Sequence, residues 1–413
     1  MNIKKGIVAL AFVFAILQLR AQERPRYIFI NSAPNRHWTV AKPATFTRSI
    51  FDRIINKIDA PVNQKLVVGI TCIFDYLGHN LDSVEKSLDK FLVLSKETRV
   101  PIFIQLDGVN WIGARPDLYN WWDANKPGYN AENRKNVEWT GWDESQAIKI
   151  SWRNWGAQLR VLPAPNIASP AFVKAQIDAL NRLVPRIVTW YNSLPASQKY
   201  LLGGIKLGHE ASIGVNAYYY KNGNRYLELM PDNSSLDPQE SYNADAGFNG
   251  GVAQIGYAAV KTAGIKSRGR ITAYDMEQVV FKYLDTLCLT AQNLGLPQSL
   301  IYTHQGGTYA PWEKHLSFNP ASNQHSLPGY SFYATNPTTA GDLGDVLDRR
   351  AVPGWAAAEW WWPGNSKNEW RYNLEQTLSF KDCQLLAIFN WEGMLEKHPD
   401  GIEAIKAIVH DWK

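Results

Sequence analysis

Most of the sequence repeats one arrangement, in which a short apolar segment is followed by a polar or aromatic stretch and then by an amphipathic segment. This alternation predicts strand–helix units joined into a parallel sheet, because parallel strands need a crossover that is usually a helix. The segments with the length and composition of strands are residues 27–31, 66–74, 101–106, 202–207, 298–303, 330–334, 354–358 and 385–389. Helices are expected at 46–58, 83–95, 171–194, 275–294, 340–349, 368–378 and 401–411. Eight such strands predict an α/β fold, the (β/α)₈ TIM barrel.

Two long segments interrupt the alternation, one from residue 107 to about 165 and one from 211 to about 270. They follow the third and fourth predicted strands, so both belong to the C-terminal face of the barrel, where barrel enzymes keep their active sites. Loops of this length are uncommon unless they are functional or disordered. We expect them to form ordered walls of a cleft.

The first 21 residues have the arrangement of a secretory signal peptide. Lys4 and Lys5 give a positive start, residues 7–17 are apolar, and Ala21 is a small residue at which cleavage is expected. The apolar run is too short to span a bilayer, and no later run is longer, so no membrane insertion is expected. We therefore expect a secreted or periplasmic protein in which residues 22–413 form a single catalytic barrel.

Charge and cysteine content exclude several other classes. The formal net charge is +5, part of it comes from the predicted signal peptide, and no cluster of basic residues suggests a nucleic-acid partner. The three cysteines, Cys72, Cys288 and Cys383, have neither the spacing of a zinc site nor that of a disulfide framework. No cofactor and no metal is expected.

Aromatic residues are unusually frequent, with 17 tryptophans and 19 tyrosines. Many lie in polar, glycine-rich segments, where exposed rings could stack on the faces of sugars. The alternative is that they fasten long loops to the barrel. The aromatic residues to which these two interpretations apply include Trp121, Trp122, Trp139, Trp142, Trp152 and residues 360–362.

Two glutamates follow predicted strands at positions where burying a charge without a function would cost free energy. Glu210 ends the fourth strand region and Glu359 the seventh, each after a run of small or apolar residues. Both strands deliver their ends to the same face of a barrel. Hydrolysis of a glycosidic bond needs one carboxylic acid to protonate the leaving oxygen and one carboxylate to attack or to activate water. Pairing of either glutamate with an arginine is the structural alternative.

Glutamates ending strands four and seven, with Trp391 after strand eight, resemble the pattern of clan A glycoside hydrolases, a retaining superfamily of TIM barrels. The resemblance is architectural and runs from about residue 27 to the C-terminus. It implies that Glu210 is the acid/base, that Glu359 is the nucleophile, and that Trp391 lies beneath the sugar. The clan usually has asparagine before the acid/base, where this chain has His209. A histidine can still donate a hydrogen bond, but the departure leaves the family and the sugar open.

Several other polar and aromatic residues near strand ends are expected to bind substrate. His304 could orient Glu359 or contact the sugar. Asp107 suits sugar hydroxyls, although the sequence Asp107-Gly108 could also cap a turn. The full set of expected substrate-binding residues is His209, Trp391, His304, Asp107, Asn110, Trp111, Trp361 and Asp75.

Two rival functions stay open at this point. A metal-dependent hydrolase could use His209, Glu210, His304 and Asp107, but no H-x-H or H-E-x-x-H spacing occurs and adjacent side chains of a regular strand point to opposite faces. A non-catalytic glycan-binding barrel would need no opposed carboxylates. A retaining enzyme needs them about 5–5.5 Å apart and an inverting enzyme about 7–9 Å. The sugar, its linkage, endo or exo action and the oligomeric state stay open.

Overall fold

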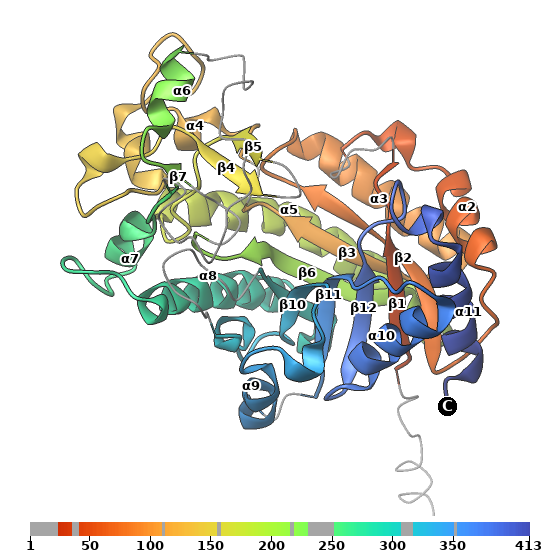
Figure 1. Ribbon diagram of the computed structural model, residues 1–413. Helices are drawn as coiled ribbons and strands as arrows, with labels where there is room; N and C mark the ends of the chain where they lie inside the picture. The colour runs from red at the N-terminus through yellow and green to blue at the C-terminus, as the bar shows by residue number, and fades with distance from the viewer. Residues whose placement is uncertain are drawn as a thin grey trace, which may run out of the picture.

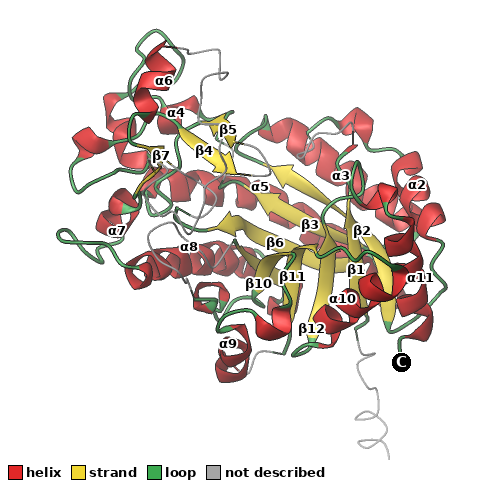
Figure 2. Cartoon of the chain, in the orientation of Figure 1, coloured by secondary structure: helices red, strands yellow, loops and turns green. Residues whose placement is uncertain are grey.

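The chain forms a closed barrel of eight parallel strands in the order β1-β12-β11-β10-β9-β6-β3-β2. The computed structural model describes residues 24–34, 41–109, 112–154, 158–214, 219–229, 252–306, 317–350 and 353–413. Figure 1 shows the strands surrounded by helices, and Figure 2 separates the two by colour. The predicted (β/α)₈ fold is confirmed. The predicted signal peptide lies outside the described residues.

All eight predicted strands are present. They are β1 (Arg26–Asn31), β2 (Leu66–Asp75), β3 (Ile102–Asp107), β6 (Leu202–Ala211), β9 (Ile301–Gln305), β10 (Gly329–Tyr333), β11 (Trp355–Trp361) and β12 (Cys383–Ile388). The fourth and seventh, β6 and β11, extend beyond the predicted ends and include Glu210 and Glu359.

The helices on the outside of the barrel also match their predicted positions. They are α2 (Arg48–Ile58), α3 (Leu81–Thr98), α5 (Pro170–Ser193), α8 (Ala273–Asn293), α9 (Leu343–Arg350), α10 (Lys367–Ser379) and α11 (Pro399–Asp411). Several begin at side chains that accept a hydrogen bond from an exposed backbone N–H, such as Asn80 at α3 and Thr272 at α8. In the part of residues 306–328 that the structure describes, a 3-10 turn at Asn319–Ala321 is the only helical element.

The lower half of the barrel interior is filled with aromatic rings. Tyr27 and Phe29 stack with centroids 5.0 Å apart, Phe29 and Phe103 lie 5.5 Å apart, and Tyr302 meets Phe103 edge-on at 5.8 Å. Arg24 closes the bottom by donating hydrogen bonds to the carbonyl oxygens of Ser299, at 2.7 Å, and Leu202, at 2.8 Å. Because aromatic rings fill this half, the polar side chains of the barrel interior lie at the opposite, C-terminal end.

The two long insertions pack together on one side of the C-terminal face (Figure 1). The first contains α4 (Pro116–Tyr119), β4 (Ser151–Asn154) and β5 (Gln158–Val161). The second contains β7 (Tyr219–Tyr220), α6 (Gly223–Leu229), β8 (Val252–Ala253) and α7 (Tyr257–Thr262). Trp152, Tyr220 and Val252 share a small core between them, and Glu138 of the first insertion accepts a hydrogen bond from the backbone N–H of Gly256 at 2.9 Å. We call this pair of insertions the side lobe.

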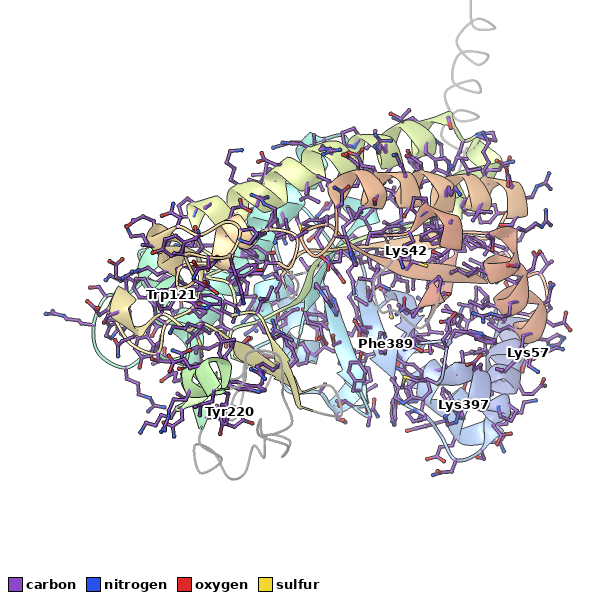
Figure 3. The ribbon with its side chains drawn as sticks, turned by 90° about the horizontal axis from the view of Figure 1, so that it is seen from above. Lys42, Lys57, Trp121, Tyr220, Phe389 and Lys397 are labelled. Atoms are coloured by element: carbon purple, nitrogen blue, oxygen red, sulfur yellow. The ribbon has the colours of Figure 1, made fainter. Side chains whose placement is uncertain are left out.

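Aromatic residues of the side lobe mainly fasten its loops. The indole N–H groups of Trp121, Trp139 and Trp142 donate to the carbonyl oxygens of Ile148, Arg134 and Gly269. In Figure 3, Trp121 and Tyr220 lie in the side lobe, apart from Phe389 at the end of β12. The loop-fastening alternative thus describes these tryptophans better than sugar stacking. Among the described helices, none is long and apolar enough to cross a membrane.

Candidate active site

Glu210 and Glu359 meet inside the C-terminal end of the barrel. One carboxylate oxygen of each lies within 4.8 Å of the other and of a ring nitrogen of His304. Both glutamates are only 7% exposed. Two carboxylates this close in a buried setting cannot both be charged without cost, so the site has to distinguish them.

An irregularity in β6 brings Glu210 to this place. The pairing of β6 with β9 passes from Leu207 opposite Thr303 to Ala211 opposite Gln305, so β6 holds extra residues between these points. Gly208, His209 and Glu210 all have positive φ angles, of 102°, 31° and 51°. As adjacent residues, His209 and Glu210 were expected to point to opposite faces of a strand and so not to share a site. That expectation is wrong here, because this part of β6 is not a regular strand.

Both side chains of this irregular segment reach the barrel mouth. The rings of His209 and His304 lie roughly parallel with centroids 6.4 Å apart, while Glu210 contacts Ser331 on β10. Gly306 makes room for the turn, since a Cβ there would lie 2.4 Å from the Cβ of Glu210.

Three hydrogen bonds link Glu210, His304 and Ser331 in a ring. The backbone N–H of Glu210 donates to Nδ1 of His304 at 3.1 Å. Because an N–H can only donate, Nδ1 carries no proton, and the proton of the neutral imidazole is on Nε2. Nε2 then donates to Oγ of Ser331 at 2.7 Å, and the Ser331 hydroxyl donates to Oε1 of Glu210 at 2.8 Å. Burial, Lys206 and His209 hold the pKa of His304 well below its usual value, which agrees with this neutral form.

The surroundings of Glu210 favour its protonated form. Burial, followed by the charge of Glu359, raises the pKa of Glu210 to about 7. The Ser331 hydrogen bond and the positive charges of Lys206 and Arg153 oppose this rise. Because Oε1 accepts from Ser331, the proton of the neutral acid belongs on Oε2. Arg153 comes from β4, so the first insertion contributes a charge to the site.

The surroundings of Glu359, unlike those of Glu210, favour the negatively charged carboxylate. The Tyr333 hydroxyl donates to its Oε1, and the Lys206 ammonium nitrogen lies 3.6 Å from its Oε2. Tyr333 is 42% exposed as a whole, but desolvation of its hydroxyl group and the charges of Glu359 and Glu210 raise the pKa of Tyr333 well above its usual value. The phenol therefore keeps its proton and donates it. A donor and a cation both stabilise negative charge on Glu359.

Three residues of this site were missed by sequence reasoning: Ser331, Tyr333 and Lys206. Ser331 and Tyr333 stand two apart on β10, which places them on one face of the strand. Lys206 is a charge among the glycines and apolar residues that form the first part of β6. Both patterns were visible in the sequence and could have identified these residues.

Of the residues expected to bind sugar hydroxyls, Asp107 and His209 lie together. Oδ2 of Asp107 is 3.3 Å from Nδ1 of His209, and burial raises the pKa of Asp107 to about 7. Oδ1 of Asp75 accepts the backbone N–H groups of Leu77, at 3.2 Å, and Gly78, at 2.8 Å, and its expected contact with substrate stays a prediction. It stabilises the turn after β2. Asn110 and Trp111 lie outside the described residues.

The expected sugar platform at Trp391 is not supported by its burial. The Trp391 side chain is 2% exposed and packs in the main core, so it has little ring face to offer a sugar. Trp361 is partly buried against the rings of Trp370 and His398, with centroids 5.5 and 5.4 Å away. Phe389 is linked to the carboxylates through Tyr333, because its ring lies edge-on to the Tyr333 ring at 6.3 Å and the Tyr333 hydroxyl donates to Glu359.

Glu210, His304 and Glu359 could also be read as three ligands of a metal ion, since one atom of each lies within 4.8 Å of the others. However, both ring nitrogens of His304 already have hydrogen-bond partners in the protein. Glu359 also has a cation, Lys206, at 3.6 Å. A metal would have to displace the histidine from its ring of hydrogen bonds and approach that cation, so the arrangement suits acid–base chemistry better.

Comparison with known proteins found no matching family model and no matching curated sequence. Among solved structures, the catalytic domain of β-amylase from Paenibacillus polymyxa is similar with a TM-score of 0.47 and 10% identity, over 94% of this chain and 99% of that one. A glycoside hydrolase family 5 enzyme from Prevotella bryantii has a TM-score of 0.37 and 10% identity, over 95% and 98%. A family 26 endo-β-1,4-mannanase from a Bacillus species has a TM-score of 0.39 and 11% identity, over 96% and 88%. What the chain does therefore has to come from the chemistry of its own residues.

Proposed function

We propose that this protein is a glycoside hydrolase that cleaves a glycan or oligosaccharide by a retaining mechanism, with Glu210 as acid/base and Glu359 as nucleophile. The observation that carries the proposal is the contrast between two buried carboxylates whose oxygens approach within 4.8 Å. Glu210 has a raised pKa of about 7, whereas Glu359 has a phenol donor and an ammonium beside it. Opposed environments of this kind divide a carboxylate pair into acid and base.

The reaction follows in two steps. Glu210 donates the proton on its Oε2 to the glycosidic oxygen, while a carboxylate oxygen of Glu359 attacks the anomeric carbon and the leaving group departs. Glu210, now ionised, accepts a proton from water as the water oxygen attacks the same carbon. The bond to Glu359 breaks, and Glu210 regains its proton.

The separation of the carboxylates supports retention. Inverting enzymes hold their carboxyl groups about 6.5–9.5 Å apart to leave room for a water between acid and base. The nearest oxygens of Glu210 and Glu359 lie within 4.8 Å, which is closer to the spacing of about 5–5.5 Å in retaining enzymes than to the inverting range. The attacking group is then Glu359 itself.

We further propose that the protein is exported through residues 1–21 and that its substrate is a carbohydrate. N-terminal sequencing of protein recovered outside the cytoplasm tests the export. A first residue at or close to Gln22 is expected, and an intact Met1 would contradict it.

The central test replaces each carboxylate and adds azide as a substitute nucleophile. Glu359→Ala should lower turnover of a 4-nitrophenyl β-glycoside, selected from a panel of such glycosides, by about a thousandfold or more. Azide should restore part of it by attacking from the side that Glu359 occupied, giving the glycosyl azide of inverted configuration. With Glu210→Ala, azide should intercept the glycosyl-enzyme and give the azide of retained configuration.

A matched control is Glu392→Gln, which alters another buried glutamate near the same face. Glu392 accepts hydrogen bonds from Ser32 and the backbone of Ala33 and pairs with Arg53, and it should keep near-normal turnover. Near-normal turnover by Glu359→Ala would refute the assignment. Glycan binding by the wild type without cleavage of any substrate in the panel would favour a non-catalytic barrel.

A further inference from the structure

Lys206 is a buried cation that the fold itself does not need. It lies in the middle of β6, its side chain is fully buried, and its ammonium nitrogen has no hydrogen-bond acceptor in the part of the chain that the structure describes. Its ion-pair partner is Oε2 of Glu359, at 3.6 Å. A buried ammonium with unsatisfied N–H groups lowers stability, so its presence calls for another reason.

The position of Lys206 directs its charge toward the site. In the strand register it stands between Gln105 of β3 and Tyr302 of β9. Tyr302 and Phe103 belong to the aromatic lower half of the barrel. Apolar packing on that side keeps water away, and a charge in such surroundings acts on its neighbours more strongly than it would in water.

The groups around Lys206 are the ones that must hold or transfer a proton. Its charge lowers the pKa of Asp107 and Glu210, and it also lowers the pKa of His209 and His304. The titratable and charged groups facing Glu210 come from five strands: Arg153 on β4, Lys206 and His209 on β6, His304 on β9, Tyr333 on β10 and Glu359 on β11. Lys206 approaches Glu359 rather than Glu210 as an ion pair.

We propose that Lys206 is a positioning residue whose ammonium holds the negative charge on Glu359, so that the one proton of the carboxylate pair resides on Glu210. The proposal rests on the glycosidase function proposed above. Without Lys206, the two carboxylates would compete more evenly for the proton. A fraction of the enzyme would then hold a protonated nucleophile and an ionised acid, which is the unreactive arrangement.

The test is Lys206→Met, which keeps an unbranched side chain one atom shorter and removes the charge. Titration of carboxyl-¹³C-labelled glutamates by NMR, with signals assigned through Glu210→Gln and Glu359→Gln, requires no substrate. In the wild type, the first proton taken up as the pH falls should appear at the carboxyl carbon of Glu210. In Lys206→Met, this proton should be shared between the carboxyl carbons of Glu210 and Glu359, and turnover of the 4-nitrophenyl glycoside should fall by about a hundredfold. The melting temperature should stay the same or rise, because an unsatisfied buried charge has been removed.

Gln105→Met is the matched control, since it places the same side chain at the paired position on β3 without removing a charge. It should leave the first proton on Glu210, as in the wild type. If the first proton also stays on Glu210 in Lys206→Met, or if that variant only lowers the melting temperature, the proposal is overturned. Failure of the glycosidase proposal itself would appear separately, as an unaltered turnover in Glu359→Ala.

Discussion

The Ser331 hydroxyl determines which oxygen of Glu210 can carry a proton. Its oxygen accepts a hydrogen bond from Nε2 of His304, and its single hydrogen is donated to Oε1 of Glu210 at 2.8 Å. The acid proton is left on Oε2. A neutral side chain thus orients the carboxyl group of Glu210.

Replacing Ser331 should change the pH dependence of activity in a defined direction. The Ser331 hydrogen bond lowers the pKa of Glu210, so Ser331→Ala should raise it above the wild-type value of about 7. Because the role proposed for Glu210 as an acid requires its protonated form, kcat/KM should then persist to higher pH than in the wild type. The maximal rate should fall by about tenfold, since the carboxyl group is no longer held in one orientation.

Ser331→Thr keeps a hydroxyl on the same β-strand and serves as the control. It should restore most of the maximal rate and return the alkaline limb of the kcat/KM profile toward that of the wild type. An alkaline limb that moves to lower pH in Ser331→Ala would contradict the assigned hydrogen-bond direction.

At the residue scale, sequence reasoning identified groups that end a strand but not those that stand within one. Glu210 and His304 were singled out because a polar side chain follows an apolar run. Lys206 and Ser331 lie inside their strands, where the apolar neighbours suggested only a core. Their positions stand out in the sequence, but their partners do not: Lys206 approaches Glu359 and Ser331 donates to Glu210, each on another strand.

Among the elements, β6 departs furthest from a regular strand. Its positive φ angles at His209 and Glu210 are uncommon for residues with a side chain, and they depend on the neighbouring loop for support. That support includes Gly306, directly after β9, where an added Cβ would lie 2.8 Å from the Cα and the carbonyl oxygen of Glu210. Glu210 is thus held in place by the absence of a side chain at Gly306 as well as by its hydrogen bond with Ser331.

Gly306→Ala should therefore displace Glu210 from Ser331. The added methyl group meets backbone atoms, which cannot move away as a flexible side chain can. We expect kcat to fall by about 10- to 100-fold while the barrel remains folded, because misplacement of a catalytic group by about 1 Å has effects of this size. Circular dichroism and kinetics on the same samples separate the two effects.

Gly344→Ala is the control for this change. A Cβ at Gly344, in α9, would meet only Phe380, at 3.7 Å, and alanine favours a helix. Its activity should equal that of the wild type. Equal activity in Gly306→Ala as well would mean that the tight approach to Glu210 does not constrain the acid.

The regular elements could be predicted from the sequence, and the irregular one could not. Strands and helices could be predicted from the spacing of apolar residues and from the length of each apolar segment. All eight strands lie within a few residues of their predicted bounds. The extra residues in β6 produce no apolar pattern, so the fourth strand was expected to stop at residue 207. The sequence therefore placed Glu210 at a strand end but could not show that His209 faces the same site.

For the whole molecule, the side lobe is joined through a buried acid. Glu138 of the first insertion accepts the N–H of Gly256 at the start of α7 in the second. Burial raises the pKa of Glu138 to about 8, even though several backbone hydrogen bonds lower it. The link between the insertions is thus made mainly by a neutral carboxylic acid below that pH.

This raised pKa predicts a pH-dependent stability. Unfolded Glu138 would titrate near its ordinary value of about 4.3, so the folded state binds the proton more tightly. Its stabilising effect is complete below that value and is lost as pH rises toward 8. Glu138→Gln does not titrate, so the stability advantage of the wild type over this variant should be largest near pH 5 and smallest near pH 8.

Thermal unfolding at pH 5, 6.5 and 8 measures this difference. Asp107 and Glu210 also have raised pKa values, but they are present in both proteins, so their effects cancel in the comparison. A difference in melting temperature that is the same at all three pH values would contradict the role assigned to Glu138.

The closure of the barrel has a consequence for the order in which the chain can fold. β1 pairs with β12, with Tyr27 opposite Leu385 and Ile30 opposite Ile388. The first strand therefore gains its second neighbour only when the last strand has formed. Contacts between such distant parts of a chain form slowly, and until then β1 and β11 each present an open edge to other molecules. A chain that ends before Cys383 should therefore aggregate rather than form a smaller barrel, which light scattering during refolding would detect. Synthesis of nearly the whole polypeptide must precede completion of the site, even though Glu210 and Glu359 are both made well before the end.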